Sequence, residues 1–353
     1  MDTKLILGIE TSCDDTSICL IEGVPGFNSI AQPKNKTILS HQTFSQNLAK
    51  WGGVVPEIAA RNHIQKLTPL VLTSLEEANK KFEDIDAIAV TALPGLLGPL
   101  LTGISYAKTI SLLKKLPIIA VNHLFAHLEA IHIDQQVSYP YLGLLVSGGH
   151  SLFVKVSSPR EMEVISSTID DAAGEAFDKG GKILGLPYPA GRIIDDLAKE
   201  GDDQFHKFPI GLKGSKDGRM SFSGLKTSLR QYVEQNPKAL ERESQIQKDV
   251  CASYQKAIVE SLVSKAKEVF HLIDSDTRNL PFVVGGGVAC NSLLRSEMQK
   301  RFDCHFVTPK FCTDNGAMVA NYGLLIYEDK VNYPECLQID AQSRYISKTS
   351  FKK

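Results

Sequence analysis

The chain has 353 residues, of which 43% are hydrophobic and 22% are charged, and its formal net charge is -1. This length is sufficient for two lobes with separate cores, and the composition is that of an average globular protein. A net charge near zero excludes a protein that attracts nucleic acid through a strong overall positive field, but it leaves a local basic surface open.

The lack of a recognisable targeting signal and the pattern of cysteines together predict a reducing compartment. No apolar segment approaches the roughly 20 residues that span a bilayer, and no leader precedes the first apolar strand, so we expect a cytoplasmic protein with no membrane anchor. The seven cysteines are odd in number and form no Cys-x-x-Cys pair. We therefore expect reduced thiols and neither a disulfide framework nor a thiolate zinc site.

The first predicted element is a hairpin over residues 5–21, in which a small polar turn joins two apolar strands. Residues 141–156 repeat this plan around the turn at residues 147–150. The backbone amides of such turns can face an anion. This weak internal duplication predicts two similar α/β lobes that face each other across a cleft. Hairpins also argue against a plain doubly wound fold, whose parallel strands need helical crossovers.

Further strands and helices follow each hairpin. Hydrophobic periodicity predicts helices over residues 58–78 and 248–272 and buried strands over residues 85–91 and 281–285. Two glycine-containing turns, 94–103 and 285–291, each follow a strand and open a helix. Such turns can bring backbone close to a phosphate or nucleotide, but strand-to-helix turns also use glycine for steric reasons alone.

His123 and His127 form the most informative local pattern. They follow an apolar strand at residues 116–121 and lie four residues apart, so a helix would present both imidazoles on one face. Two neutral imidazoles can share a divalent ion, but a third ligand must come from elsewhere. The alternative is a pair of surface histidines with no ligand. Because no Glu follows His123, the zincin motif with its built-in base is absent.

Six motifs together carry a family resemblance. They occupy residues 8–16, 147–151, 171–179, 221–227, 285–291 and 312–318. In this order they resemble the universal tRNA threonylcarbamoyladenosine synthase family, in particular its bacterial catalytic subunit, over about residues 4–330. The resemblance implies the α/β fold of the actin, sugar-kinase and heat-shock-ATPase superfamily. It also implies an acyltransferase that moves the threonylcarbamoyl group of threonylcarbamoyl-adenylate to N6 of adenosine 37 in tRNAs that read codons beginning with A.

The resemblance also implies a division of the chain. An N-terminal lobe would cover residues 1–128 and a C-terminal lobe residues 129–330. The second lobe would carry a helical insertion around residues 190–250, and its last helix, 315–328, would pack back toward the first lobe. Residues 331–353 would form a C-terminal tail.

By the same resemblance, the metal ligands would be His123, His127 and Asp314, which supplies the missing third ligand. They would hold one divalent ion, with Fe²⁺ favoured and Zn²⁺ as the alternative, and they would leave positions open for substrate. The alternative for Asp314 is an N-cap on the helix that follows it.

Substrate positions are implied in the same way. Asp14 resembles a carboxylate that orients or deprotonates the attacking amine, with an Asx-turn residue as its alternative. His150 borders the second turn and is either part of the site or a core histidine. The adenylate would be held by the turn amides of Leu145, Val146, Ser147, Gly148 and Gly149, and its ribose and adenine by Asp178, Gly191, Asp195 and Asn291.

Binding of tRNA has one candidate surface. Basic residues gather between residues 207 and 230, with aromatic residues among them, and could follow an RNA backbone and stack on a base; a solvated surface is the alternative. The residues are Lys207, Lys213, Lys216, Arg219, Lys226 and Arg230, with Phe205, Phe208 and Phe222. The family further implies a small paralogous partner subunit and a P-loop ATPase, or a homodimer.

Three other functions remain as alternatives. A sugar or acid kinase of the same superfamily would use the cleft for phosphoryl transfer, although magnesium-phosphate sites prefer carboxylates and waters to imidazoles. A metallopeptidase would need the base that is missing after His123. A non-catalytic scaffold that only binds nucleotide would be expected to lose the metal ligands, which this chain retains.

Overall fold

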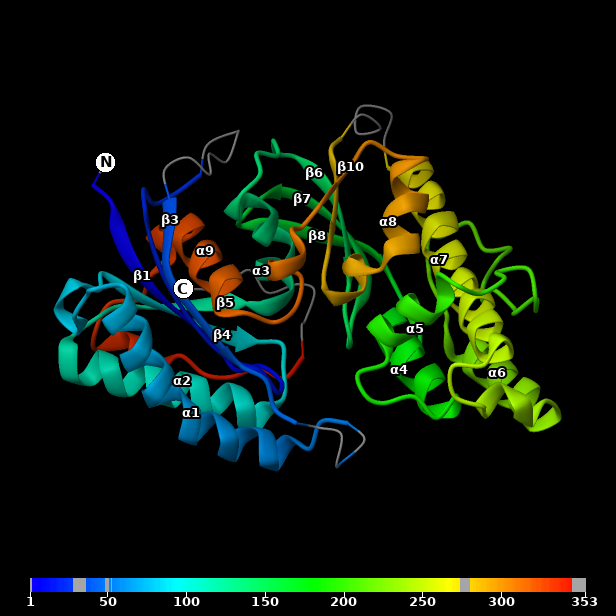
Figure 1. Cartoon of the computed structure of the whole chain (residues 1–353). Helices are drawn as coiled ribbons and strands as arrows, with labels where there is room; N and C mark the ends of the chain where they lie inside the picture. Colours follow the sequence, from blue (N-terminus) through cyan, green and yellow to red (C-terminus); the bar gives the residue numbers. More distant parts are fainter. Residues whose placement is uncertain (1, 28–35, 48–50, 52, 274–279, 345–353) are drawn as a thin grey trace.

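The computed structural model describes residues 2–27, 36–47, 51, 53–273 and 280–344, so residues 345–353 of the expected tail lie outside the described residues. Two five-stranded sheets organise the chain (Figure 1). The first has the order β3-β2-β1-β4-β5. Its strands are β1 (Lys4–Glu10), β2 (Thr16–Gly23), β3 (Lys36–Phe44), β4 (Ala87–Leu93) and β5 (Ile118–Asn122).

The second sheet repeats the plan of the first. Its order is β10-β9-β6-β7-β8. In each sheet an antiparallel hairpin, β1–β2 or β6–β7, is extended by one more antiparallel strand on one side and two parallel strands on the other. The duplication and both hairpins are therefore confirmed. The strands are β6 (Tyr141–Val146), β7 (Ser151–Ser158), β8 (Glu161–Ser167), β9 (Phe282–Gly285) and β10 (Cys304–Phe306).

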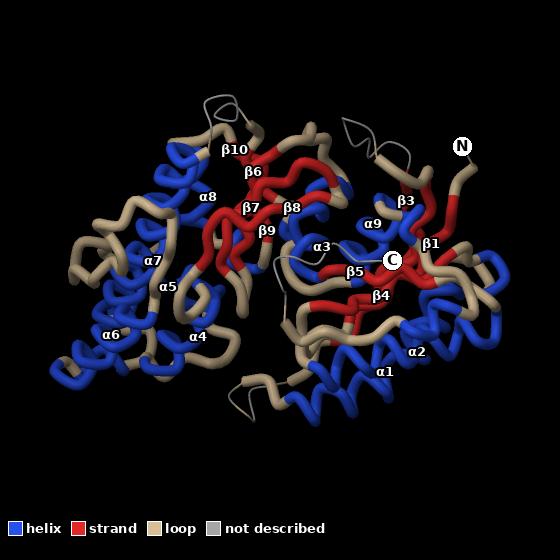
Figure 2. The backbone as a smooth tube through the Cα atoms, turned by 180° about the vertical axis from the view of Figure 1, so that it is seen from behind, coloured by secondary structure: helices blue, strands red, loops and turns tan. Residues whose placement is uncertain are grey.

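Helices cover both faces of the first sheet (Figure 2). α1 (Pro56–Glu77) and α2 (Leu97–Lys114) lie on its outer face, and α3 (His123–Glu129) and α9 (Gly316–Leu325) lie on the side toward the second sheet. The second lobe carries α4 (Ala173–Ile183), α5 (Gly191–Ala198), α6 (Ser223–Gln235), α7 (Gln245–Leu272) and α8 (Ser292–Gln299). Within the described ranges, no helix combines the length and apolar character needed to cross a membrane.

Strand β1 contributes to two cores because its side chains alternate between the faces of the sheet. Leu5, Leu7 and Ile9 pack in the core that includes α1 and α2, whereas Ile6 packs in the core shared with α9 and the second sheet. Gly8 lies on this second face, where a Cβ atom would be 2.5 Å from the carbonyl oxygen of Gly316. Glycine at this position therefore lets α9 lie directly against β1.

The predicted helices and strands agree with the structure to within a few residues. The expected helix at 58–78 is α1, and the expected helix at 248–272 is the larger part of α7. The turn at 94–103 opens α2 as expected. The turn at 285–291 contains a short 3-10 segment (Gly287–Cys290) before α8 begins. Both turns therefore place a glycine-rich backbone at the end of a central strand.

Candidate active site

Helix α3 begins directly after strand β5 and carries both histidines of the expected metal pair. The Asn122 side chain accepts hydrogen bonds from the backbone N–H groups of Leu124 and Phe125, which caps the helix and fixes where it begins. The His123 and His127 rings lie on one helix face with centroids 4.6 Å apart. Their exposed fractions are only 7% and 1%. The alternative of two solvent-exposed surface histidines is therefore wrong.

Asp314 approaches the two histidines from the turn before α9. The N-cap of α9 is Asn315, whose Oδ1 accepts from the Met318 N–H at 2.9 Å. Asp314 is therefore not the N-cap, and the alternative that assigned it that role is wrong. Its Oδ1 lies 3.0 Å from His127 Nε2 and 3.5 Å from His123 Nε2.

These three side chains fit a divalent cation. Their donor atoms all lie within 4.8 Å of one another. Two ligands of one tetrahedral ion with bonds of about 2.0–2.2 Å are roughly 3.3–3.6 Å apart. The 3.5 Å distance from Asp314 Oδ1 to His123 Nε2 lies in that range, and the 3.0 Å distance to His127 Nε2 lies slightly below it. Two imidazoles and a carboxylate form a donor set that both Fe²⁺ and Zn²⁺ accept.

Glu10 lies behind His123 and was not identified from the sequence. It is the last residue of β1 and is fully buried. Its Oε2 lies 3.2 Å from His123 Nδ1 and accepts from the Thr91 hydroxyl at 2.6 Å, while its Oε1 accepts from the Ser12 N–H at 2.5 Å. A carboxylate on Nδ1 fixes the ring so that Nε2 faces Asp314. The available signal was a lone acidic residue at the end of an apolar strand.

The histidine and carboxylate groups of this cluster stabilise one another's charged forms. Burial alone would lower the pKa of His123, but Asp314 and Glu10 outweigh it and raise that pKa to about 9. Burial likewise opposes ionisation of Asp314 and Glu10, yet the nearby histidines hold the pKa of both carboxyl groups below its ordinary value. Burial lowers the pKa of His127. A bound cation would therefore replace the proton of His123.

Two adjoining cavities of about 1010 and 980 Å³ form the cleft between the lobes. These volumes are at the upper end of the roughly 300–1,000 Å³ typical of small-molecule sites. The first cavity is lined by residues of both hairpin turns together with His123 and Asp314. The second extends over the C-terminal lobe. Asp14, Gly148, Asp178 and Tyr188 line both cavities, so they mark the boundary between them.

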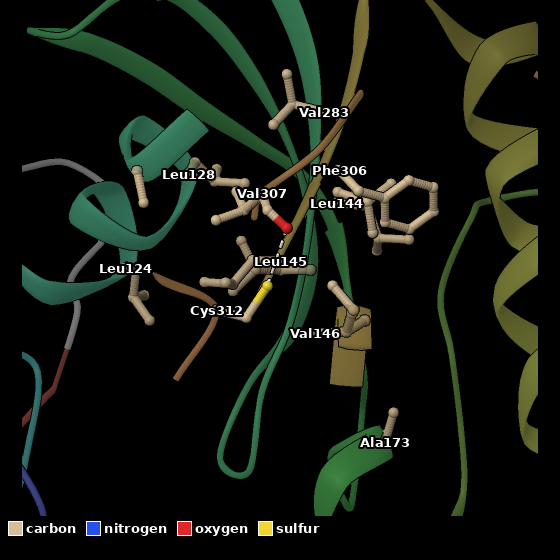
Figure 3. Close-up of a cluster of buried hydrophobic side chains, with 14 of the residues drawn as sticks. Leu124, Leu128, Leu144, Leu145, Val146, Ala173, Val283, Phe306, Val307 and Cys312 are labelled. Carbon is tan, nitrogen blue, oxygen red and sulfur yellow. Dashed lines mark hydrogen bonds between the residues drawn. The ribbon is translucent and has the colours of Figure 1, made fainter. Parts of the chain in front are cut away.

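Most of the expected substrate residues meet at this cleft. Ser147, Gly149 and His150 line the first cavity, Gly191, Asp195 and Asn291 line the second, and Asp14, Gly148 and Asp178 line both. Leu145 and Val146 differ, because their side chains are buried in the hydrophobic core, Leu145 on the face of β6 toward α3 and Val146 on the opposite face (Figure 3). Only their backbone could contribute to ligand binding. Burial lowers the pKa of His150 to about 4, so its ring is neutral at the cavity wall.

Polar side chains of the second cavity also hold its wall together. The Asn291 Oδ1 caps α8 by accepting from the Leu294 N–H, and its Nδ2 donates to Gln255. The Asp195 carboxylate accepts from both the N–H and the hydroxyl of Ser292. These contacts fix the position of the loop before α8. A ligand could therefore bond only to the donor and acceptor sites of Asn291 and Asp195 that these contacts do not use.

The turn that carries Asp14 is braced from α1. His63 is fully buried, and its Nε2 lies 3.0 Å from the Cys13 carbonyl oxygen while its Nδ1 lies 2.8 Å from the Thr16 hydroxyl. A carbonyl can only accept, so Nε2 carries the hydrogen. Gln46 donates to the Asp14 carbonyl at 2.7 Å. Burial raises the pKa of the Asp14 carboxyl group, which makes it a better proton acceptor than an exposed aspartate.

The basic segment between residues 207 and 230 surrounds an anchored loop. Lys265 of α7 is buried, and its ammonium group donates to the carbonyl oxygens of Leu212 and Ser215. Phe208 and Phe222 are buried in the core, so the expectation that they could stack on a base is wrong; of the three phenylalanines, only Phe205 is exposed. These two rings pack in the hydrophobic core of the insertion and are therefore not available at its surface.

Comparison with known proteins identifies the family. The family described as TsaD, tRNA N6-adenosine threonylcarbamoyltransferase, matches residues 37–321. A protein of that name from Geotalea uraniireducens (strain Rf4) is 41% identical over 323 residues, which cover 90% of this chain and 89% of the relative. This chain belongs to the tRNA N6-adenosine threonylcarbamoyltransferase family. Another relative with this name, from Thermosipho africanus (strain TCF52B), is 40% identical over 342 residues, which cover 95% of this chain and 98% of the relative.

Solved structures agree on the fold. Component A of (R)-2-hydroxyglutaryl-CoA dehydratase from Acidaminococcus fermentans matches 96% of this chain and all of its own, with a TM-score of 0.53 and 14% identity. Full-length HypF in its phosphate- and nucleotide-bound form matches 92% of this chain and 46% of its own, with a TM-score of 0.54 and 14% identity. The fold is that of the actin, sugar-kinase and heat-shock-ATPase superfamily, as expected for a tRNA N6-adenosine threonylcarbamoyltransferase.

Proposed function

We propose that this chain transfers the threonylcarbamoyl group from threonylcarbamoyl-adenylate to N6 of adenosine 37 in tRNAs that read codons beginning with A. The observation that carries the proposal is the joined cleft, in which one cavity contains His123 and Asp314 and the other contains Asp195 and Asn291. The acyl group would occupy the first cavity and the adenosine the second, with the phosphate near Gly148 at their boundary.

We further propose that His123, His127 and Asp314 hold one divalent ion, with Fe²⁺ favoured and Zn²⁺ as the alternative. When bound, this ion would act as a Lewis acid that polarises the carbamoyl carbonyl or holds the threonine carboxylate. Glu10 keeps the His123 ring oriented toward the site. Glu10 would therefore contact a metal ligand and not the metal itself, and its role would be to orient that ligand.

The remaining chemistry falls to the two hairpin turns. The N6 amine attacks the carbamoyl carbon, the bond from that carbon to the phosphate oxygen breaks, and adenosine monophosphate leaves. The amine loses a proton in this step, and Asp14, with its raised pKa, is the proposed acceptor. Backbone amides at Ser147–Gly149 would hold the phosphate. Asp178, Gly191, Asp195 and Asn291 would surround the nucleoside.

Two surfaces support the proposed macromolecular partners. Exposed apolar side chains on the outer helices, Ile64 and Leu72 of α1 and Leu97, Leu101, Leu112 and Leu113 of α2, support a contact with the small paralogous subunit or a second copy of the chain. Exposed Lys207, Lys213, Lys216, Arg219 and Arg230 support a contact with tRNA phosphates. The P-loop ATPase rests on the family resemblance alone, as does action in the cytoplasm.

The function is tested by product analysis. Purified chain, with and without cell extract, is incubated with threonylcarbamoyl-adenylate and unmodified tRNA, and the tRNA is digested to nucleosides and analysed by mass spectrometry. The proposal requires N6-threonylcarbamoyladenosine at position 37 in the presence of wild-type chain and its loss in Asp14→Asn. A tRNA that remains unmodified under both conditions would refute the transfer. A separate incubation with ATP, in which the chain phosphorylates a small-molecule acceptor, would favour the kinase alternative instead.

A further inference from the structure

One tyrosine of the cleft has no partner of its own. Tyr188 lies in the loop between α4 and α5, is half-buried, and lines both cavities. Its hydroxyl makes no hydrogen bond, and its ring contacts no other ring, within the described part of the chain. Among the described residues that line the first cavity, it is also the only phenylalanine, tyrosine or tryptophan. Both the aromatic face and the polar group of this side chain are therefore free for a ligand.

Contacts with α4 hold the loop of Tyr188 in place. At one end the Leu186 N–H donates to the Gly181 carbonyl oxygen at 2.8 Å, and at the other end the Ala190 N–H donates to the Asp178 carboxylate at 2.8 Å. A Cβ atom on Gly181 would lie 2.1 Å from the Ala190 Cβ, so glycine is needed for the loop to lie this close to the helix. Proline occupies both positions next to Tyr188 and restricts the backbone there. A ligand that contacts the ring would therefore cost little conformational freedom.

The tip of this loop belongs to the first cavity. Leu186, Pro187 and Tyr188 all line that cavity, and Val54 and Leu96 of the N-terminal lobe add further apolar side chains. Sites of roughly 300–1,000 Å³ hold whole small molecules, so a cavity of about 1010 Å³ is larger than a threonylcarbamoyl group alone requires. In the proposed reaction the N6 amine must reach the carbamoyl carbon. The purine that carries this amine must therefore enter the first cavity, where an aromatic face can receive it.

An unpaired cation lines the same cavity. Lys179 and Lys182 both extend from α4 to its wall. Lys179 is paired, since its Nζ lies 2.6 Å from Asp171 and 3.4 Å from Glu175. Lys182, in contrast, is exposed and forms no ion pair or hydrogen bond with any residue that the structure describes. A free ammonium group and a free aromatic ring in one cavity suit a single-stranded nucleic acid, whose base stacks while its backbone contacts the cation.

We propose that Tyr188 and Lys182 form the RNA side of the first cavity. The base of adenosine 37 leaves the anticodon loop and stacks on the Tyr188 ring, and the Lys182 ammonium group contacts a phosphate next to that base. Stacking uses the face of the purine and leaves its N6 edge free to meet the acyl group. The adenine of the adenylate is not the partner of this ring, because its proposed place is beside Asp195 and Asn291. The inference rests on the proposed function and adds the residues that hold the acceptor base.

Binding of two anticodon stem-loops tests the stack. One carries adenosine at position 37 and the other an abasic nucleotide, and each is titrated into the full-length chain. The wild type should bind the first about tenfold more tightly, a difference of about 1.4 kcal/mol, which is within the range for one base on an aromatic ring. Tyr188→Leu keeps an apolar side chain without an aromatic face and should bind both alike, whereas Tyr188→Phe should resemble the wild type. A tenfold preference that persists in Tyr188→Leu would refute the stack.

Calorimetry with adenosine monophosphate separates the two adenines. Tyr188→Leu should bind this nucleotide like the wild type and should keep its metal, which also shows that it folds. Weaker nucleotide binding in this variant would overturn the proposal, because the ring would then serve the adenylate. A wild-type chain that forms N6-threonylcarbamoyladenosine but binds both stem-loops alike would overturn this inference and leave the proposed function intact. A wild-type chain that modifies no tRNA would refute both.

Salt dependence tests the cation. Lys182→Ser should weaken binding of the adenosine stem-loop and reduce the slope of affinity against salt by about 0.7, the contribution of one phosphate contact in a single strand. Lys267→Ser is the matched control, because Lys267 is exposed on α7 and lines neither cavity. It should leave the slope of the wild type unchanged. Equal slopes for the two variants would refute the phosphate contact.

Discussion

The two hairpin turns occupy equivalent places in the two sheets, yet they present different chemistry to the cleft. Strand β1 ends in Glu10, a buried carboxylate in contact with the His123 ring, whereas β6 ends in Val146, a side chain of the hydrophobic core. The first turn continues into Asp14, and the second consists of Ser147, Gly148, Gly149 and His150. The first turn therefore contributes charged side chains, and the second turn contributes mainly exposed backbone.

This difference shows how a duplicated fold divides one reaction between its halves. A turn with buried carboxylates can orient a ligand and accept a proton. A glycine turn can bring backbone amides close to a phosphate because no side chain is in the way. At Gly148 and Gly149 an added Cβ would meet no protein atom within 4 Å, so both positions face open space. The comparison predicts that the first turn is sensitive to the loss of side chains and the second to their addition.

The largest expected effect comes from removing the ligand that joins α9 to α3. Asp314→Ala should lose most of the bound metal and lower transfer by about 10³-fold, because removal of one group that stabilises developing charge costs about 10²–10³-fold and the ion leaves with it. Metal content by elemental analysis and single-turnover transfer provide the measurement. Asp329→Ala, which breaks an exposed ion pair with Arg160, is the control and should resemble the wild type. Full metal content in Asp314→Ala would contradict the ligand assignment.

The next effect tests whether Glu10 acts through the His123 ring. Glu10→Gln keeps a hydrogen-bond acceptor but removes the charge, and metal affinity should fall by about 10- to 100-fold, as for other carboxylates behind metal-bound histidines. Competition with a metal-sensitive dye measures this change. Glu22→Gln on the neighbouring strand, where the carboxylate pairs with Lys80 at the surface, should leave the affinity unchanged. Unchanged metal affinity in Glu10→Gln would show that the Glu10 carboxylate does not act through the His123 ring. The proposed difference between the two turns would then lose this support.

An added side chain should impair the second turn. Gly148→Val should weaken binding of adenosine monophosphate by about 10- to 100-fold, since overfilling a packed site costs roughly 1–3 kcal/mol, while metal content and folding remain intact. Gly214→Val is the matched control, because a Cβ there also meets no protein atom within 4 Å and the residue is exposed away from the cavities. Tight nucleotide binding by Gly148→Val would show that the second turn does not contact the ligand.

A smaller effect with a pH signature is expected at His63. Burial lowers its pKa below the ordinary 6.5. The neutral ring therefore braces the Asp14 turn above about pH 6.5, and this stabilisation is lost as pH falls through the lower pKa of the folded state. His63→Ala should reduce transfer by about tenfold through loss of two hydrogen bonds worth about 1 kcal/mol each, without loss of metal. His63→Gln should retain more activity and should lose the part of the acid limb that comes from His63, which leaves only the part that comes from Asp14. Identical pH profiles for His63→Gln and the wild type would exclude this role.

The smallest effect concerns tRNA binding, far from either turn. Replacing Lys213, Lys216 and Arg219 together with Ser should weaken tRNA binding and flatten its dependence on salt by a slope of about 2 to 3, since each phosphate contact contributes about 0.7–0.9. Nucleotide binding should not change. Exposed Lys238, Lys267 and Lys300 provide a control triple variant of equal charge. If both triple variants bind tRNA alike across the salt series, the basic segment is only a solvated surface.

The sequence was sufficient to predict the parts of this comparison that depend on local pattern. Apolar runs around polar turns predicted both hairpins, and the four-residue spacing of His123 and His127 predicted their common helix face. The family resemblance, not the pattern, supplied Asp314. What could not be predicted depends on contacts that are distant in sequence: Glu10 meets His123 across 113 residues, and His63 meets Cys13 across 50. No local pattern encodes such pairs.

Burial of individual aromatic residues was equally hard to predict. Phe208 and Phe222 lie among basic residues, which favours a surface, but both are buried in the core, where the Phe208 ring contacts the ring of Tyr254 from α7. Similarly, Asp314 and Asn315 are adjacent and both residue types can cap a helix. Only the backbone direction at the start of α9 decides that Asn315 caps and Asp314 faces the histidines.

The most direct test of this division of labour is a crystal structure of the chain with its native metal and a non-hydrolysable threonylcarbamoyl-adenylate analogue, with anomalous data collected at the metal edge. The account predicts one anomalous peak about 2.0–2.2 Å from His123 Nε2, His127 Nε2 and an Asp314 carboxylate oxygen. It also predicts that the acyl group lies beside that peak, the phosphate at Gly148 and the adenine in the cavity of Asn291. A metal peak elsewhere, or an adenine in the first cavity, would contradict the account.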